Sequence, residues 1–319
     1  MAAVLTDLAE RVRGRVRLDE PLAGYTTYRI GGPAAALVEP ADPEDVIASL
    51  AFARDVGVPW LVLGLGSNVL IRDAGFAGLV LVIGKAMADL TRDVGGEVGV
   101  WRAGAGLPTP LLARRSAAAG LAGVHRLVGV PGTVGGGVYM NAGAHGQEYR
   151  DVVRAVELVT ERGSVERRAG AEIDWRYRTS HLGPVVVLSA TVALVPDDPR
   201  RLEADIHEHF RWRKEGTPFN EPCCGSVFRN PAVPVPAPGA GGGDGGGELR
   251  TAGQLIDAAG MKGYRVGGAQ VSPMHANYIV NTGHASADDV LRVIAAVQGR
   301  VAEAFGVELE LEVRVIGEQ

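Results

Sequence analysis

The chain has 319 residues, of which 46% are hydrophobic and 22% are charged, and these proportions are typical of a globular protein with more than one domain. Its formal net charge of −5 argues against the basic surface that a nucleic-acid-binding protein presents. No apolar run approaches the roughly 20 residues that cross a bilayer, and acidic residues near the N-terminus argue against a signal peptide. We therefore expect a cytoplasmic protein without a membrane or nucleic-acid partner.

Helices and short strands alternate along the chain without a regular rhythm. Asp42 and Pro43 mark the start of one helix, and Thr109 and Pro110 mark the start of another, which ends at Gly120. Continuous apolar runs predict buried strands at 60–63, 79–83 and 185–188. Because the β-α-β repeat of a doubly wound sheet is missing, this pattern favours an α+β fold.

The last third of the chain begins with a charged helix at 199–213, which marks a domain boundary. A later helix follows the cap residue Ser286 and runs to about Phe305. From Val307 to Val315, apolar and charged residues alternate, which predicts a strand with one charged face. Residues 232–248 are mostly proline and glycine, a composition that buries too little apolar surface to fold. We expect this insertion to be a flexible loop without catalytic function.

The cysteines and histidines indicate neither a disulfide nor a metal site. Cys223 and Cys224 are adjacent, where a disulfide is strained, and they fit a reducing compartment. His207 and His209 lack the spacing of two metal ligands on one helix face and have no cysteine nearby. We expect both histidines on a solvated helix face and no bound metal.

Two glycine-rich loops are candidates for binding a phosphate group. Their candidate binding residues are Gly64, Gly66, Ser67 and Asn68 in the first loop and Gly132, Thr133, Gly135, Gly136 and Asn141 in the second. Main-chain N–H groups in such loops can surround phosphate oxygens. The first loop lacks the third glycine and the following helix of a dinucleotide-binding fingerprint. Apolar residues interleaved in the second loop indicate that it is packed, so together the loops predict a pyrophosphate held mainly by main chain.

A third motif, Cys223–Pro231, presents a serine directly after a glycine. Gly225 permits backbone angles that other residues resist, and Asn230-Pro231 signals a turn. A serine in this setting can meet a ligand atom, and the alternative is an ordinary strand that leads into a tight turn.

Six short motifs, taken together and in this order, resemble those of one enzyme family. They are Tyr25–Pro33, Gly64–Asn68, Pro131–Gly143, Tyr177–Ser180, Gly225–Pro231 and Glu312–Arg314. From about Leu22 to Gly317 the chain is similar to the UDP-N-acetylenolpyruvoylglucosamine reductases, also called UDP-N-acetylmuramate dehydrogenases. The resemblance implies non-covalently bound FAD, NADPH as co-substrate, and reduction of the enolpyruvyl ether of UDP-N-acetylglucosamine enolpyruvate to UDP-N-acetylmuramate for peptidoglycan synthesis.

The resemblance also implies an architecture. A PCMH-type FAD-binding unit would occupy 22–198, in subdomains of about 22–84 and 85–198, followed by a substrate-binding domain at 199–306 and a final strand at 307–319 that returns to the flavin unit. The chain resembles the shorter form of the family, because there is no room for an extra tyrosine-bearing loop between the strand near Val185 and the helix near Pro199. The 232–248 insertion, Gly137 and His145 depart from the family pattern, in which alanine and tyrosine are common at the last two positions.

Residue roles follow from the same resemblance. Ser226 would donate a proton to the substrate, Arg178 would bind the substrate carboxylate, and Glu312 would orient or polarise the intermediate. The implied substrate contacts are Asn230, Lys262 and His275. Without the resemblance, Arg178 reads as an ordinary salt-bridge residue, and the strand pattern does not separate Glu312 from Glu308 and Glu310.

Two other functions stay open from the sequence. One is an oxidase of the same flavin-binding architecture that tethers its flavin covalently, for which only His125 is placed. Acid precipitation distinguishes the two enzymes, because non-covalent FAD stays in the supernatant. The other is a module that senses UDP-sugars without turnover, which consumption of NADPH with the enolpyruvyl substrate would exclude.

Overall fold

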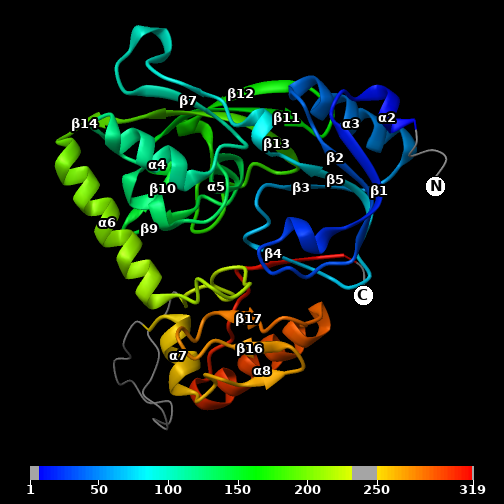
Figure 1. Cartoon of the computed structure of the whole chain (residues 1–319), viewed down its shortest axis with the longest axis vertical. Helices are drawn as coiled ribbons and strands as arrows, with labels where there is room; N and C mark the ends of the chain where they lie inside the picture. The colour runs from blue at the N-terminus through cyan, green and yellow to red at the C-terminus, as the bar shows by residue number, and fades with distance from the viewer. Residues whose placement is uncertain (1–6, 232–249, 318–319) are drawn as a thin grey trace. The chain divides into compact units, whose positions relative to one another are not determined.

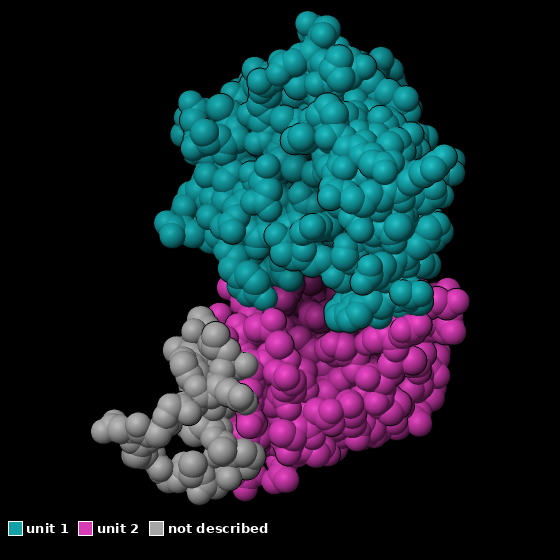
Figure 2. All heavy atoms as spheres, turned by 90° about the vertical axis from the view of Figure 1, so that its left-hand side faces the viewer, with its two compact units in different colours: residues 1–20, 34–65, 77–213 teal, residues 21–33, 66–76, 214–319 magenta. Residues whose placement is uncertain are grey.

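A computed structural model describes residues 7–231 and 250–317, so the predicted 232–248 loop lies outside the described residues (Figure 1). Contacts divide the chain into two compact units, coloured separately in Figure 2. Unit 1 comprises Met1–Glu20, Ala34–Leu65 and Ala77–Arg213, and unit 2 comprises Pro21–Pro33, Gly66–Phe76 and Lys214–Gln319. Two early segments therefore group with the C-terminal third, which the expected domain boundaries do not anticipate. Among the described helices, none has both the length and the apolar composition of a membrane span.

The first sheet of unit 1 has the strand order β1-β2-β5-β3. Its strands are β1 (Arg15–Pro21), β2 (Pro33–Glu39), β5 (Phe76–Val82) and β3 (Trp60–Leu63), and β3 runs parallel to β5. Helix α3 (Pro43–Val56) packs against this sheet, because its Val46 and Leu50 share an apolar cluster with Leu79 and Leu81 of β5. The predicted helix start is confirmed: the Asp42 side chain accepts a hydrogen bond from the N–H of Asp45.

The second sheet of unit 1 is antiparallel, with the order β12-β11-β13-β7-β6. Its strands are β12 (Val165–Ala169), β11 (Val153–Thr160), β13 (Val185–Ala193), β7 (Val100–Gly104) and β6 (Leu90–Thr91). Strand β13 lies at the centre, and burial of its first six residues explains the continuous apolar run in the sequence.

Further helices and two short strand pairs belong to unit 1. The helices are α4 (Thr109–Ala118), α5 (Val134–Tyr139) and the long α6 (Pro199–Gly216), whose last residues belong to unit 2. Leu202 and Ile206 of α6 pack on Ala113 and Ala117 of α4. The short pairs join β9 (Gly143–Ala144) to β10 (Gln147–Glu148) and β8 (Leu121–Ala122) to β14 (Val195–Pro196). Helix α2 (Leu8–Arg11) is the described part of the expected N-terminal helix.

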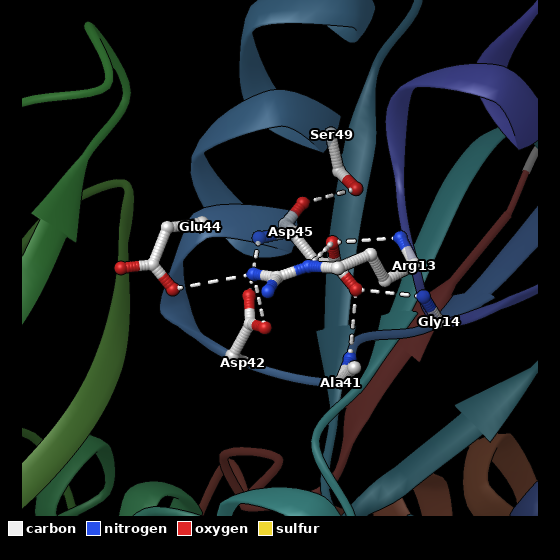
Figure 3. Close-up of polar contacts among 7 residues, drawn as sticks. All are labelled: Arg13, Gly14, Ala41, Asp42, Glu44, Asp45 and Ser49. Carbon is white, nitrogen blue, oxygen red and sulfur yellow. Dashed lines mark hydrogen bonds and ion pairs between the residues drawn. The ribbon is translucent and has the colours of Figure 1, made fainter.

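A buried carboxylate ties the start of the chain to α3 (Figure 3). Asp45 is 2% exposed and accepts hydrogen bonds from the N–H groups of Arg13, Gly14 and Ala41 at 2.9, 2.8 and 2.9 Å. Burial raises the pKa of this carboxyl group, but the three hydrogen bonds outweigh burial and the pKa is lowered overall. Asp45 is therefore ionised at neutral pH, although it lies inside the protein.

Unit 2 is built around a three-stranded antiparallel sheet of β15 (Arg265–Val266), β16 (Ala269–Val271) and β17 (Ile279–Asn281). Two helices, α7 (Ala252–Ala258) and α8 (Ala287–Phe305), share its core. The predicted cap of α8 is confirmed, because the Ser286 side chain accepts a hydrogen bond from the N–H of Asp289. A separate parallel pair joins β4 (Val69–Ile71) to β18 (Arg314–Ile316).

The predicted strand from Val307 to Val315 is largely wrong. Within the described chain, only Arg314–Ile316 of this region form a hydrogen-bonded strand. The preceding residues are held by isolated contacts, such as a bridge between Leu311 and Phe228. The alternation is nevertheless real, since Leu309 and Val313 are buried. An extended segment that lies on a core alternates in burial whether or not a neighbouring strand bonds to it.

Candidate active site

The structure brings Ser226 and Glu312 together within unit 2. Ser226 is half-buried and follows Gly225, whose φ of +82° lies in the left-handed region. The carbonyl oxygen of Val227 accepts hydrogen bonds from the N–H groups of Glu312 at 2.8 Å and Val313 at 3.3 Å. Since Glu312 bonds to the residue directly after Ser226, the two predicted catalytic residues lie on adjacent segments.

The buried groups near this pair are neutral. Tyr28 is fully buried and Cys224 is 2% exposed. Burial raises the pKa of the Tyr28 hydroxyl well above its usual value, and it raises the pKa of the Cys224 thiol, with a smaller contribution from Glu312. Cys224 is therefore a protonated packing residue at neutral pH, not a nucleophile.

The end of the first glycine loop lies beside Ser226 and Glu312 in unit 2. The Asn68 side chain donates from Nδ2 to the carbonyl oxygen of Glu312 at 3.1 Å, and the Asn68 carbonyl accepts from the N–H of Arg314 at 3.1 Å. A Cβ added to Gly225 would lie 3.9 Å from the carbonyl oxygen of Ser67. Asn68, expected to contact the cofactor, therefore also positions the Glu312 segment.

The three predicted substrate residues also belong to unit 2. Asn230 accepts a hydrogen bond through Oδ1 from the N–H of Ala252, at the start of α7, at 3.0 Å. Lys262 forms an ion pair with Asp257, with 2.7 Å between Nζ and Oδ2. Burial, helped by the charge of Lys262, lowers the pKa of His275.

The protonation state of His275 follows from its contacts. Its Nδ1 accepts the N–H of Asn277 at 3.2 Å, so the neutral ring carries its proton on Nε2. Because the pKa of His275 is lowered, the neutral form prevails at pH 7 and Nε2–H is the available donor.

Arg178 belongs to unit 1 and lies in a tight turn outside the strands. The N–H of Arg176 donates to the carbonyl of Thr179 at 2.9 Å, and the N–H of Thr179 donates back at 3.2 Å. Arg178 has a φ of +58°, and its guanidinium carbon lies 4.9 Å from the ring centre of Tyr177. A Cβ at Gly143 would lie 3.4 Å from Nη1 of Arg178. Gly143 and the Arg178 guanidinium are therefore close neighbours.

Asn141, which stays a predicted cofactor-binding residue, holds the Arg178 turn through its side chain. It is fully buried, and its Nδ2 donates both to Oε2 of Glu148 and to the carbonyl of Arg176, each at 3.0 Å. Its Oδ1 accepts the N–H of Arg150 at 3.1 Å. Both amide hydrogens are thus used inside the protein. Glu148 was missed from the sequence because no local motif marks it.

The two glycine loops meet in unit 1. A Cβ on Gly64 would lie 2.5 Å from Oγ1 of Thr133, so the Gly64 main chain packs directly against the Thr133 side chain. A Cβ on Gly136 would meet only Oγ1 of Thr133, at 3.8 Å, which indicates an open surface there. Gly135 faces the other way, and its Cβ would lie 2.8 Å from the Cβ of Ala105. The open main chain at Gly136, next to Gly64, fits a ligand that approaches the backbone, such as the pyrophosphate of FAD.

Gly137 and His145, the two single-residue departures from the family pattern, each contact an aromatic ring. A Cβ on Gly137 would lie 2.3 Å from the ring of buried Tyr149, whose hydroxyl pairs with Thr109 at 2.7 Å. His145 stacks on His209, with 4.0 Å between ring centres. The expectation that His209 lies on a solvated face is therefore wrong, because the β9–β10 turn covers it.

Two further histidines, His207 and His125, each lie near a carboxylate. His207 is exposed and lies 3.9 Å from Glu203. His125, the one candidate for a covalent flavin link, is buried and has its Nε2 3.6 Å from a carboxylate oxygen of Asp205. Burial lowers the pKa of His125.

Two protein-family models and several curated proteins match this chain. Residues 34–168 match the family described as FAD binding domain, and residues 217–316 match the family described as UDP-N-acetylenolpyruvoylglucosamine reductase, C-terminal domain. The reductase of Rubrobacter xylanophilus is 42% identical over 312 residues, covering 97% of this chain and 98% of its own. The reductase of Heliobacterium modesticaldum is 40% identical over 316 residues, covering 98% and 95%.

A solved structure of a reductase with the same family name also matches this chain. The crystal structure of UDP-N-acetylenolpyruvylglucosamine reductase from Thermus caldophilus superimposes with a TM-score of 0.76 at 34% identity, covering 96% of this chain and 99% of that one. With these identities over nearly the whole length, the chain belongs to the UDP-N-acetylenolpyruvoylglucosamine reductase family, and FAD is its cofactor.

Proposed function

We propose that this chain reduces UDP-N-acetylenolpyruvoylglucosamine to UDP-N-acetylmuramate, with NADPH as reductant, and that Ser226 supplies the proton. The proposal is carried by the bond between the Glu312 N–H and the residue after Ser226, which joins two of the residues expected to act on the substrate. The product is a peptidoglycan precursor, and both substrates are small molecules. We place the reaction in the cytoplasm on the sequence expectations given above.

The reaction requires one hydride and one proton. When bound and reduced by NADPH, FAD would supply the hydride to the outer carbon of the enol ether. Electron density then accumulates on the neighbouring carbon and spreads into its carboxylate, so the protein must stabilise negative charge and protonate that carbon. The Ser226 hydroxyl donates this proton, and the carbon–hydrogen bond that forms completes the saturated lactyl ether.

Arg178 and Glu312 have complementary roles in this proposal. The guanidinium of Arg178 binds the substrate carboxylate in a bidentate way, which fixes the double bond and neutralises the developing charge. Glu312 orients the intermediate or acts through water. Asn68 supports Glu312 by binding its carbonyl group at 3.1 Å.

The remaining predicted contacts divide between cofactor and substrate. Main chain at Gly64, Thr133 and Gly136 would hold the FAD pyrophosphate. For the UDP part of the substrate, Lys262 would supply positive charge that it now shares with Asp257, and His275 would donate from Nε2.

The test separates the two half-reactions of Ser226→Ala by rapid-mixing absorbance. NADPH should bleach the flavin at close to the parental rate, because that step needs no proton from Ser226. Reoxidation by the enolpyruvyl substrate should slow by about 10²–10⁴-fold, as expected for a lost general acid. Ser164→Ala is the matched control, since Ser164 is an exposed turn residue bonded to Thr160. Parental reoxidation in Ser226→Ala would remove Ser226 from the role of proton donor.

A further inference from the structure

The position of Ser226 depends on the residues that follow it, because a glycine precedes it. A Cβ at Gly225 would meet only the carbonyl oxygen of Ser67, at 3.9 Å, so Gly225 itself is loosely packed, although Cys224 before it is buried. Ser226 itself lies outside the helices and strands of the described chain. Its placement therefore depends on the hydrogen bonds that hold the next two residues, Val227 and Phe228.

Asn277 holds both of these residues. Its carbonyl oxygen accepts the N–H of Val227 at 2.9 Å. Its side chain accepts the N–H of Phe228 through Oδ1 at 2.9 Å and donates from Nδ2 to the Phe228 carbonyl at 2.8 Å. Asn277 is 4% exposed and Phe228 is 1% exposed. The Asn277 amide thus bonds to both the N–H and the carbonyl of Phe228, as the backbone of a neighbouring strand would. Because both residues are buried, water does not take over these hydrogen bonds when the amide is lost.

The opposite edge of the same short segment carries Glu312. The Val227 carbonyl accepts the N–H of Glu312 at 2.8 Å, and Phe228 forms a bridge with Leu311. Val227 and Phe228 are therefore fixed from two sides, by Asn277 and by the C-terminal segment. A shift of this segment would displace Ser226 and Glu312 at once.

Asn277 is attached to the three-stranded sheet of unit 2. Its own N–H donates to Nδ1 of His275 at 3.2 Å, and the chain enters β17 at Ile279, two residues later. Strand β17 pairs with β16 in the sheet of unit 2. The Asn277 side chain thus connects this sheet to the segment after Ser226, and the sheet fixes the position of that segment.

We propose that Asn277 is a positioning residue for proton transfer from Ser226. The inference rests on the proposed function, in which the Ser226 hydroxyl protonates a substrate carbon. A proton donor must lie within hydrogen-bond reach of its target, and a displacement of about 1 Å can cost about 10²-fold in rate. Asn277 acts through the peptide that carries Ser226 and not on the substrate itself.

Asn277→Asp tests this inference with little change in size. The variant keeps an acceptor for the Phe228 N–H but, when ionised, loses the donor to the Phe228 carbonyl. With the flavin reduced beforehand by dithionite, we expect reoxidation by UDP-N-acetylenolpyruvoylglucosamine to slow by about tenfold or more, and KM to change by less than about twofold. Flavin reduction by NADPH should stay at the parental rate.

Asn281→Asp is the matched control, because Asn281 is a buried amide four residues further along the same segment. It is 5% exposed, its Nδ2 donates to the Tyr28 carbonyl at 3.0 Å, and its Oδ1 accepts the N–H of Gly283 at 2.9 Å. We expect the two variants to lose similar thermal stability, with parental reoxidation in Asn281→Asp alone. Equal slowing in both variants would show a general loss of structure and would overturn the inference.

A double-mutant cycle with Ser226→Ala gives the decisive readout. If Asn277 acts through Ser226, Asn277→Asp should slow the parent but add almost nothing in the Ser226→Ala background. A full additional slowing in that background, or a parental rate for Asn277→Asp while Ser226→Ala is slow, would overturn the positioning role alone. A parental rate for Ser226→Ala would overturn the proposed function and this inference with it. If Asn277→Asp does not fold, Asn277→Ser enters the same cycle.

Discussion

Arg178 lies at a turn whose shape is fixed from outside the turn. Asn141 binds the carbonyl of Arg176, and the two bonds between Arg176 and Thr179 close the turn around Tyr177 and Arg178. The left-handed φ of Arg178, unusual for a residue with a side chain, is therefore held by its neighbours. The backbone thus sets where the Arg178 side chain leaves the turn, and its guanidinium carbon lies 4.9 Å from the Tyr177 ring centre.

Arg178→Lys should impair the substrate half-reaction far more than the conserved charge suggests. Lysine keeps the positive charge but loses the planar fork that binds a carboxylate in a bidentate way. We expect reoxidation by substrate to slow by about 10–10²-fold, the loss of one charge-assisted bond at about 1.5–3 kcal/mol, while NADPH reduces the flavin normally.

Arg176→Lys is the control for this change. It lies in the same turn, and its exposed side chain forms an ion pair with Asp174, with 2.7 Å between Nε and Oδ1. Both half-reactions should stay parental in Arg176→Lys. If Arg178→Lys turned over substrate as fast as Arg176→Lys, Arg178 would be a structural residue.

At the scale of elements, the carboxylate of Asp45 joins the first residues of the chain to α3. Asp45→Asn should destabilise the protein by about 1–3 kcal/mol at pH 7, because an amide cannot accept all three buried N–H groups. The folded-state pKa of Asp45 is lowered, so its stabilisation is present above the unfolded pKa of about 3.9 and is lost as pH falls through the folded value. The difference in unfolding free energy should therefore shrink below about pH 4.

Chemical denaturation at several pH values measures this difference. Asp55→Asn, at an exposed position on the same helix, is the control and should change stability by less than about 0.5 kcal/mol. If the difference in unfolding free energy between Asp45→Asn and the parent stayed constant down to pH 3, this would contradict the ionised state assigned to Asp45.

Two neighbouring glycines in α5 should separate packing from cofactor binding. Gly135→Val places side-chain atoms against Ala105, so it should lower the thermal stability of the FAD-free protein and also its retention of FAD. Gly136→Val meets open space, so it should weaken FAD retention with a much smaller change in FAD-free stability. Thermal melts with and without added FAD measure both effects. Full FAD occupancy in folded Gly136→Val would place the cofactor elsewhere.

At the scale of the whole molecule, the insertion at 232–248 is predicted to be passive from its composition. Replacing residues 239–247 with a short Gly-Ser linker should leave NADPH oxidation with substrate within a few-fold of the parent, since glycine- and proline-rich chain adds little packed surface. Steady-state absorbance of NADPH measures this. Loss of most turnover in a variant that still binds FAD would assign the insertion a role in the reaction.

Much of the fold followed from the sequence because the signals are local. Strand β3, the cap of α3 at Asp42 and the cap of α8 at Ser286 depend on residues within a turn or a short run of each other. The family and its FAD followed from motifs of a few residues each. The sequence by itself therefore determined the class, the cofactor and the starts of several elements.

Only the tertiary structure decided what each candidate residue touches. Gly135 and Gly136 are equivalent in sequence, yet one packs on Ala105 and the other faces open space. Likewise, Glu312 differs from Glu308 and Glu310 because it is half-buried and its N–H binds beside Ser226, whereas the other two are exposed. Asn277 reaches Phe228 across 49 residues. A hydrogen bond between residues far apart in the chain leaves no periodicity and no local motif, so only the folded chain shows it.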